Sequence, residues 1–431
     1  MGDSGSRVII VGAGPVGLYM AHALQKAGID FVILEQHSTP LRIAGQVLFI
    51  WPQTVRLFDQ IGLLGPLQDA ALELHKKKRI CGIDGRVMTC SNFWDNMREN
   101  HGYPFLPVLR RDVVRILYDH LEGDDARIIT NAQVVGVETH DSSVDVKLKD
   151  GAIINGSFVI GSDGVHSQIR SLMQKIERQS AKTSDPNIMI PNFYGVFGQA
   201  SNLDLQIESE VLFESRGAGT VIQCVATKKN AHFVSLTPRP QEVHRDGTRY
   251  AKEAMETYAM SISDVRICPG VTFADIWKHA DKTTAVMVNQ EEGFSDRWSH
   301  DRIVLVGDAV HKTTSVNGLG MNCGIHSAAA LANEIRNLEG SSTAQLREAF
   351  ARYQQSREAE CRVIWSQGYR TIREVTKKSW INWAWDTYVL PWVDIENFAK
   401  GILVSLLLIR HGQILSYVPF DSKQGSISWT R

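Results

Sequence analysis

The stretch RVIIVGAGPVGLYMAHALQKAGIDFVILE, residues 7–35, decides the fold of the chain. Its apolar residues 8–11 predict a buried parallel strand, residues 18–27 predict a helix, and residues 31–34 predict a second strand that delivers Glu35. A strand, a glycine-rich turn, a helix, a strand and an acidic residue in this order are typical of a dinucleotide-binding unit. The sequence therefore predicts an α/β fold with a Rossmann-like domain at its start.

Each glycine of the turn has its own task. Gly12 makes the tight turn, Gly14 lets backbone N–H groups approach a pyrophosphate, and Gly17 lets the helix pack closely on the strand. The N-terminus of the helix adds partial positive charge, and Glu35 can accept hydrogen bonds from both hydroxyls of an adenosine ribose. These features together predict a bound dinucleotide.

Composition narrows the class of protein. A chain of 431 residues is long enough for two or three domains, and its net charge of −1 disfavours a nucleic-acid partner. The six cysteines show no CxxC pair and no histidine at metal-binding spacing, which indicates reduced thiols in a reducing compartment and implies no metal. The basic run at 76–79 reads as a solvated loop.

Two features of the sequence bear on the expected cellular location of the protein. The first strand starts so early that no signal peptide is expected before it, which favours the cytoplasm. The most apolar run, residues 401–409, is far shorter than the roughly 20 residues that span a bilayer. A transmembrane anchor is therefore not expected.

Two later turns, like the first, follow a predicted strand and lead toward a helix. In GSDGVHSQIR, residues 161–170, a strand leads through a Ser-Asp-Gly turn into a helix, which points backbone amides at an anion. In GDAVHKTTSVNGLGMN, residues 307–322, Asp308 follows a buried strand and can hold a polyol hydroxyl. The glycine-rich helix start at 318–324 can face a developing anion.

With these motifs in this order, residues 7–360 resemble the flavin-dependent monooxygenases of the single-component aromatic hydroxylase type. The segments GVHS, GDxVHKxT, LRRDVVRILYD and QEEGFSDRW are similar to the fungal secondary-metabolism branch that includes indole-diterpene and meroterpenoid epoxidases. The resemblance implies bound FAD, with NADPH or NADH as a transient reductant and O2 as co-substrate.

The resemblance also implies which residues hold FAD. Glu35 would bind the adenosine ribose, and Arg110 would pair with a cofactor phosphate or the ribityl chain. Gly45 would approach the flavin, Asp308 would hold the ribityl chain, and Asp163 would be shared between FAD and the docking nicotinamide cofactor. Glycines of the first turn would bind the pyrophosphate, and backbone N–H groups of the last helix start would face the pyrimidine edge of the flavin: Gly12, Gly14, Gly17, Gly318, Gly320, Met321 and Asn322.

Two positions depart from the family pattern. Ser315 stands where the family usually has proline, so the loop beside the flavin is expected to be less rigid. Ile325-His326-Ser327 replaces the usual acidic residue after the glycines. Neither change removes a cofactor contact.

The domain pattern follows from the alternating strands of residues 180–290, which predict an antiparallel sheet inserted into the first domain. Segment 63–104 reads as an irregular excursion with a strand-like run at 87–94, and residues 128–137 and 144–148 read as a hairpin. The expected parts are a discontinuous FAD-binding domain, a substrate-binding β-sheet domain and a C-terminal helical segment with a Trp-rich apolar tail: 1–75, 105–178 and 290–342; 76–104 and 179–289; and 343–431.

The chemistry implied by the resemblance belongs to the cofactor. The nicotinamide cofactor reduces the flavin, O2 adds at its C4a atom, and the hydroperoxide delivers an electrophilic oxygen. Transfer to an alkene needs no protein base, whereas phenol hydroxylation benefits from one. Tyr194, His232 and Tyr103 are polar candidates for that role, although a buried side chain with a structural partner is the favoured interpretation of each.

Several alternatives are weighed against this reading. Gly217-Ala-Gly219 lacks a third glycine, which disfavours a Baeyer–Villiger type, and Trp383-Ala-Trp385 lacks the Ile-Pro of a flavin halogenase motif. A non-catalytic FAD-fold protein that binds a lipid stays open. The tail is either a helical cap or, through 379–410, a peripheral membrane contact that collects an apolar substrate.

The sequence thus predicts an FAD monooxygenase that epoxidises or hydroxylates an apolar, prenylated or aromatic secondary metabolite. A phenol or aromatic hydroxylase of a polyketide or alkaloid is the alternative. The expected location is the cytoplasm or the surface of a membrane.

Overall fold

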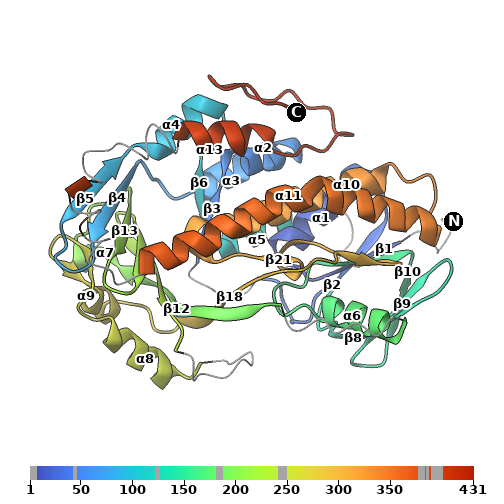
Figure 1. Cartoon of the computed structure of the whole chain (residues 1–431), viewed down its shortest axis with the longest axis horizontal. Helices are drawn as coiled ribbons and strands as arrows, with labels where there is room; N and C mark the ends of the chain where they lie inside the picture. The colour runs from blue at the N-terminus through green and yellow to red at the C-terminus, as the bar shows by residue number, and fades with distance from the viewer. Residues whose placement is uncertain are drawn as a thin grey trace.

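The computed structural model describes most of the chain: residues 7–41, 46–121, 127–180, 188–240, 250–376, 384, 388–389 and 401–431. Gly45 and the tryptophans at 380, 383, 385 and 392 lie outside these described residues. Figure 1 shows two sheets in different halves of the molecule, with the long helix α11 (Thr343–Thr376) running across both.

The first sheet has six strands and carries the predicted nucleotide-binding pattern. Its spatial order is β19-β20-β11-β1-β2-β7, with all neighbours parallel except β19. The central strands are buried along their whole length, because helices cover both faces of a parallel sheet. The strands are β1 (Val8–Val11), β2 (Phe31–Leu34), β7 (Ile128–Ile129), β11 (Phe158–Gly161), β19 (Ser299–His300) and β20 (Ile303–Leu305).

Helices α1 (Pro15–Lys26), α5 (Arg110–Asp119) and α10 (Gly320–Arg336) pack together against this sheet, and α6 (Gln168–Ser180) follows β11. The early helix prediction and the long helix after the glycines are both confirmed. The predicted 128–137 strand is wrong in part. Its first residues form β7 of the six-stranded sheet, and the hairpin consists of β8 (Val134–Thr139) and β9 (Val144–Leu148), extended by β10 (Ile153–Gly156).

The second sheet has eight strands, and most of it comes from the inserted segment, as predicted. Helices α7 (Asn202–Leu205), α8 (Lys252–Ser261) and α9 (Phe273–Lys278) and the small pair β16 (Arg266–Cys268) and β17 (Val271–Thr272) accompany it. Its spatial order is β21 (His311–Lys312), β18 (Val286–Phe294), β12 (Ile190–Ser201), β15 (Asn230–Pro238), β14 (Val221–Ala226), β13 (Val211–Arg216), β4 (Lys76–Cys81) and β5 (Val87–Ser91).

The reading of residues 76–79 as a loop is wrong. These residues form β4, which pairs in parallel with β13, and the charges of the strand are neutralised by acidic partners. The Lys77 ammonium lies 3.2 Å from the Glu214 carboxylate, and Lys78 pairs with Glu208. Acidic partners on β13 and just before it therefore allow a basic run to be a strand.

Segment 63–104 is also more regular than expected. It contains α3 (Leu64–Ala70) and α4 (Phe93–His101) beside β4 and β5, so the strand-like run at 87–94 ends early and becomes a helix. Helix α2 (Pro52–Gln60) precedes α3 and begins with a proline, and β3 (Val47–Ile50) pairs with β6 (Leu106–Leu109).

The last part of the chain lies over the first domain. After α13 (Gly401–Leu407) the chain follows α2 in an extended course, where the Gln60 amide donates to the carbonyl of Leu415 at 2.7 Å. The Tyr417 hydroxyl donates to the Ala23 carbonyl on α1 at 2.7 Å. Residues 409–431 thus cover the domain as a strap rather than as a regular helical cap.

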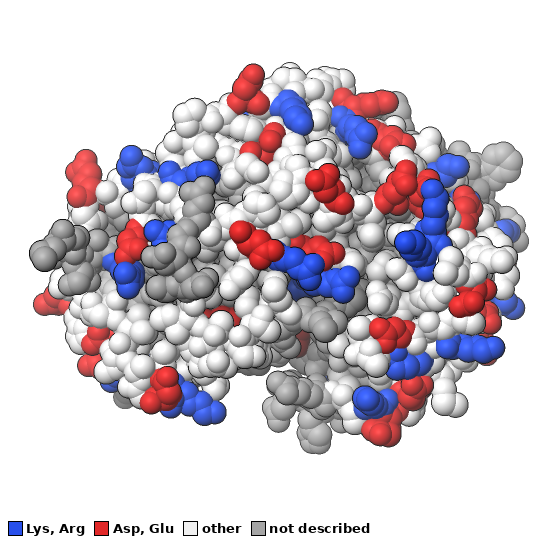
Figure 2. All heavy atoms as spheres, turned by 180° about the vertical axis from the view of Figure 1, so that it is seen from behind, with Lys and Arg blue, Asp and Glu red and all other residues white. Residues whose placement is uncertain are grey.

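The described surface carries charges of both signs (Figure 2). Figure 2 shows basic and acidic side chains interspersed over the described part of one face, with no large field of one sign. Among the described helices, none combines the length and the apolar character needed to cross a bilayer.

Candidate active site

A cavity of about 350 Å³ lies where the two sheets meet, and all three glycine-containing turns reach it. Gly14 comes from the first turn, Gly164 from the second, and Asp308 and Gly320 from the third. Parallel strands of one sheet end at the same edge, which explains why turns separated by more than a hundred residues meet. The volume is in the range of small-molecule sites.

The first turn leaves room for a ligand at one glycine and for none at the other two. A Cβ on Gly14 would meet no atom of the described residues within 4 Å, whereas a Cβ on Gly17 would lie 2.0 Å from the carbonyl oxygen of Gly12. Gly12 itself has φ of +103°, a conformation that favours glycine. Gly12 and Gly17 therefore shape the turn, and Gly14 faces open space.

Helix α1 presents unused donors to the same space. Its first ladder bond runs from the Leu18 N–H to the Gly14 carbonyl, so the N–H groups of Val16 and Gly17 have no partner within the helix. Pro15 at the first helical position has no N–H to lose. This arrangement fits the pyrophosphate of a dinucleotide.

Glu35 is buried at the end of β2 beside this turn. Its carboxylate accepts hydrogen bonds from the backbone N–H of Ala13 at 3.0 Å and of His37 at 2.9 Å. The carboxylate is thereby fixed next to the turn, although Glu35 does not line the cavity. Its contact with a ribose stays a prediction.

The carboxylate of Asp163 is used within the protein. It accepts from the Ser167 hydroxyl at 2.5 Å and from the backbone N–H groups of Gln168 and Ile169 at 2.7 and 3.0 Å. Burial raises the pKa of Asp163, and these hydrogen bonds act in the opposite direction. Its neighbours Ser162 and Gly164 line the cavity, whereas Asp163 does not. Asp163 is thus the cap of α6, and its expected cofactor contact requires this cap to be shared.

Asp308 and Lys312 form an ion pair of 2.6 Å on the cavity wall. The position of Asp308 agrees with the expected contact to a polyol chain. Lys312 was missed by the sequence reasoning, although its spacing of four residues from Asp308 and the GDxVHK pattern could have indicated it.

The start of α10 reaches the cavity as expected. Gly318, Gly320 and Met321 line it, and the first ladder bond of the helix starts only at the Cys323 N–H. The Asn322 side chain points elsewhere and makes three hydrogen bonds, from the Trp51 N–H at 3.0 Å and to the carbonyls of Phe49 and Gly318. Asn322 can therefore offer only its backbone N–H to a cofactor.

Arg110 also lines the cavity, where the helix α5 begins. Its backbone N–H donates to the carbonyl of Gln46 at 2.8 Å, and Gln46 is a further lining residue.

The two departures from the family pattern have structural partners. The Ser315 N–H donates to the Gln290 Oε1 at 3.1 Å, a bond that proline cannot make.

His326 bridges two elements with both ring nitrogens. Its Nδ1 accepts from the Gln413 N–H at 3.0 Å, and its Nε2 lies 3.2 Å from the Thr54 hydroxyl. Through these two contacts the ring joins the strap to α2. The replacement therefore serves the C-terminal strap.

The eight-stranded sheet supplies an apolar wall opposite the turns. Of the three polar candidates, His232 lines the cavity, is buried, and has an Nδ1 atom without a hydrogen-bond partner in the described part of the chain. Burial, helped by the charge of Arg111, lowers the pKa of His232 to about 4. The apolar wall consists of Phe197, Leu212, Val225, Phe233, Val234 and Val288.

The other two candidates are not on the cavity wall. Tyr194 packs edge-on against Tyr258 with ring centres 5.1 Å apart. The hydroxyl of Tyr103 donates to Asp59 at 2.8 Å in the interior, and burial raises its pKa to about 12. Neither side chain lines this cavity, so its geometry gives no support for a role of Tyr103 or Tyr194 beside a substrate.

The loop before α10 also borders the site. Thr313, Thr314 and Ser315 line the cavity, but their side-chain oxygens are buried and lack hydrogen-bond partners among the described residues. An added Cβ on Gly368 of α11 would lie 1.9 Å from the Thr313 Oγ1, so this hydroxyl packs against α11. The open glycine and the helix N-termini together fit a dinucleotide cofactor.

Comparison with known proteins agrees with this geometry. Residues 6–362 match the family model described as FAD binding domain. The chain is 54% identical to the FAD-dependent monooxygenase srdH of Neurospora crassa, covering 99% of this chain and 98% of that protein. It is 28% identical to the FAD-dependent monooxygenase ausM of Penicillium brasilianum, covering 97% and 88%.

Solved structures show the same fold. Klebsiella pneumoniae HpxO in complex with FAD and uric acid superposes with a TM-score of 0.77 at 20% identity, covering 93% of this chain and 96% of that chain. The 2,6-dihydroxypyridine-3-hydroxylase of Arthrobacter nicotinovorans superposes with a TM-score of 0.68 at 16% identity, covering 85% and 93%. From the match to the family model and to the fungal proteins srdH and ausM, the chain belongs to the FAD binding domain family and is an FAD-dependent monooxygenase of the fungal secondary-metabolism branch.

Proposed function

We propose that this enzyme uses NADPH or NADH and O2 to insert one oxygen atom into an apolar small molecule, prenylated or aromatic, of secondary metabolism. The observation that carries the proposal is the composition of the cavity. One side consists of the cofactor turns and the other of apolar side chains of the eight-stranded sheet. We also propose that the two sheets correspond to an FAD-binding and a substrate-binding domain.

FAD, when bound, supplies the redox chemistry of oxygen activation. We propose that the first turn holds its pyrophosphate through Gly14 and the α1 N–H groups, with Glu35 on the ribose. Asp308 would hold the ribityl chain, and the N–H groups at the start of α10 would face the ring. The partial positive charge of that helix end would stabilise negative charge on the reduced cofactor.

The state of His232 favours oxygen transfer to an alkene over phenol hydroxylation. A general base works best with a pKa near the operating pH, and a pKa of about 4 makes this imidazole a weak base at pH 7. A neutral imidazole can still orient a substrate by a hydrogen bond to its hydroxyl or carbonyl. Epoxidation is thus the preferred reaction, and hydroxylation of a phenol is the second candidate.

The test is turnover by the FAD-loaded enzyme with matched substrates. Prenylated aromatic compounds and the same compounds with a saturated side chain would be compared for stimulated NADPH and NADH oxidation, O2 uptake and product mass. We expect a product with one added oxygen on the alkene, and little turnover of the saturated analogue. Oxygen found on the aromatic ring would favour the second candidate, and no stimulation by any apolar compound would contradict the proposal.

The relatives are named monooxygenases, so a non-catalytic binding protein is set aside.

We also propose a peripheral membrane contact through α13, because Leu403 and Leu407 are 52% and 74% exposed there. Flotation with lipid vesicles would test this contact. Leu403→Ser with Leu407→Ser should abolish flotation, and Leu203→Ser, which changes an equally exposed leucine on α7, should leave it unchanged.

A further inference from the structure

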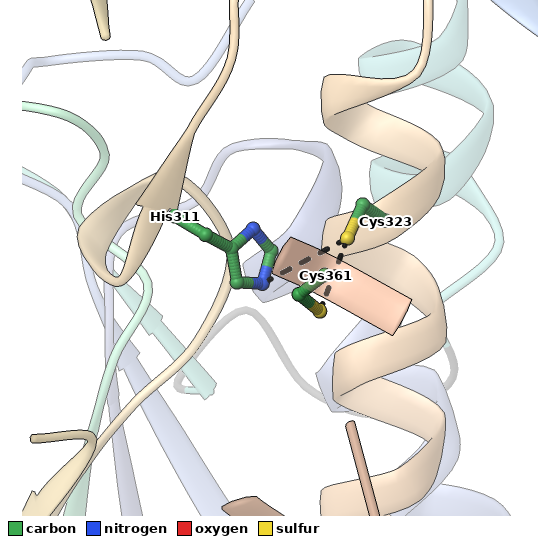
Figure 3. A group of neighbouring side chains, drawn as sticks. All are labelled: His311, Cys323 and Cys361. Atoms are coloured by element: carbon green, nitrogen blue, oxygen red, sulfur yellow. Dashed lines mark hydrogen bonds between the residues drawn. The ribbon is translucent and has the colours of Figure 1, made fainter. Parts of the chain in front are cut away.

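Behind the wall of the cavity, three chemically reactive side chains from distant parts of the chain meet (Figure 3). His311 comes from β21, Cys323 from α10 and Cys361 from α11, and all three are buried. The sulfur atoms of the two cysteines are 3.3 Å apart, and the Cys323 sulfur lies 4.0 Å from the His311 Nε2. None of the expected cofactor contacts involves these side chains.

A buried cation stands beside both sulfurs. Arg357 has no exposed surface, and its Nη2 lies 3.7 Å from the Cys361 sulfur and 4.0 Å from the Cys323 sulfur. Its Nη1 pairs with Glu360 at 2.6 Å. Two thiolates and an imidazole are typical zinc ligands, but here the guanidinium already faces the sulfurs where a metal ion would have to compete with it. The arrangement instead suits a negative charge on sulfur.

The two sulfurs are not equivalent. Cys323 donates its thiol hydrogen to Cys361. Burial acts to raise the pKa of Cys361, but the hydrogen bond from Cys323 and the charges of His311 and Arg357 hold that pKa well below its usual range. The hydrogen bond to Cys361, together with burial, raises the pKa of Cys323. Because the thiolate is the nucleophile, Cys361 is the reactive partner.

We propose that Cys361 and Cys323 are a peroxide-sensitive thiol pair, which hydrogen peroxide oxidises to a disulfide that joins α10 to α11. The Cys361 thiolate attacks one peroxide oxygen, the O–O bond breaks, and the departing hydroxide takes the proton that Cys361 gave to His311. The Cys323 sulfur then attacks the sulfur of the resulting sulfenic acid, the S–O bond breaks, and the departing hydroxide takes the thiol proton of Cys323 and leaves as water. Two thiols and one peroxide give a disulfide and two waters.

The position explains why such a pair would be useful. Lys312 and Met321 line the cavity, and they are one and two residues from His311 and Cys323. An enzyme that reduces O2 in this cavity is a source of hydrogen peroxide whenever its reduced cofactor meets O2 without substrate. The pair is thus placed where the hydrogen peroxide formed in such unproductive turnover would oxidise it. The proposal rests on the monooxygenase class and not on the identity of the substrate.

The chain carries a matched control within itself. Cys224 and Cys268 are also buried, but burial raises the pKa of both thiols, to about 11 for Cys268. The FAD-loaded full chain would be titrated with hydrogen peroxide, digested without reductant and analysed by mass spectrometry. We expect a linked peptide containing Cys323 and Cys361, lighter by about 2 Da and reversed by dithiothreitol, at doses that leave the control cysteines reduced.

Two variants test the order of the steps. In Cys323→Ser, Cys361 should gain one oxygen, about 16 Da, and in Cys361→Ser, Cys323 should stay reduced at the same dose. Retention of bound FAD shows that each variant is folded. If a serine variant does not retain FAD, the corresponding alanine variant takes its place. Oxidation of Cys224 and Cys268 at the same dose as Cys323 and Cys361, or no disulfide before the protein unfolds, would overturn the proposal. Stoichiometric zinc or copper that shields these thiols until a chelator removes it would overturn it as well.

Discussion

Replacing Gly14 by alanine separates binding of the cofactor from folding of the turn. The added Cβ meets no atom within 4 Å in the part of the chain that the structure describes, and Gly14 has φ of −77°, which alanine adopts without strain. Such a change alters stability by less than about 1 kcal/mol, so the melting temperature of the apoprotein should move by no more than about 2 °C. The added methyl group would occupy the space through which a pyrophosphate approaches the α1 N–H groups.

The expected loss of affinity follows from those N–H groups. A hydrogen bond to a charged group contributes about 1.5–3 kcal/mol, so losing one good contact to the pyrophosphate weakens FAD binding by roughly 10- to 150-fold. The Kd of FAD would be measured by fluorescence titration of the apoprotein, beside its thermal unfolding. Gly17→Ala is the control, because its Cβ would lie 2.0 Å from the Gly12 oxygen and should destabilise the apoprotein itself. A Gly14→Ala protein that binds FAD as tightly as the original chain would refute the reasoning.

The remaining predictions concern the walls of the cavity. Asn322→Ala removes three hydrogen bonds and should lower the free energy of unfolding by about 3 kcal/mol, seen as a lower melting temperature, and an unchanged melt would contradict the assigned role of the side chain. Ser315→Pro removes the N–H bond to Gln290 and should cost about 1 kcal/mol, whereas Ser315→Ala, which keeps the N–H, should not. His232 has a pKa of about 4 in the folded chain and 6.5 without burial, so the unfolded chain binds more protons between these values. Stability should therefore fall by up to about 3 kcal/mol as the pH drops from 6.5 to 4, and His232→Gln should flatten that part of a pH-dependent melting curve.

The nucleotide-binding part of the fold was predictable because its signals are local. Strand, turn and helix follow one another within residues 7–35, and Gly12 and Gly17 are each required by a nearby backbone atom. Strand β4 was not predictable in the same way. Its lysines look solvated until Glu208 and Glu214, more than a hundred residues later, are placed beside them.

The direction in which side chains point was the other feature that could not be predicted from the sequence. His232 and Tyr194 lie on neighbouring strands of one sheet, yet only the former reaches the cavity, and no local pattern distinguishes the two. The His311, Cys323 and Cys361 cluster shows the same limit. Its members show no metal-type spacing along the chain and meet only because α10 and α11 pack together beside β21.

The C-terminal strap has a consequence for the order in which the protein matures. Gln413, Leu415 and Tyr417 supply partners to α10, α2 and α1, all of which are translated long before them. While the ribosome is still adding residues to α11, those helices lack these contacts, even though domains generally fold from the N-terminal side during synthesis. We therefore expect the nascent first domain to remain open to proteases and chaperones until the strap emerges from the exit tunnel.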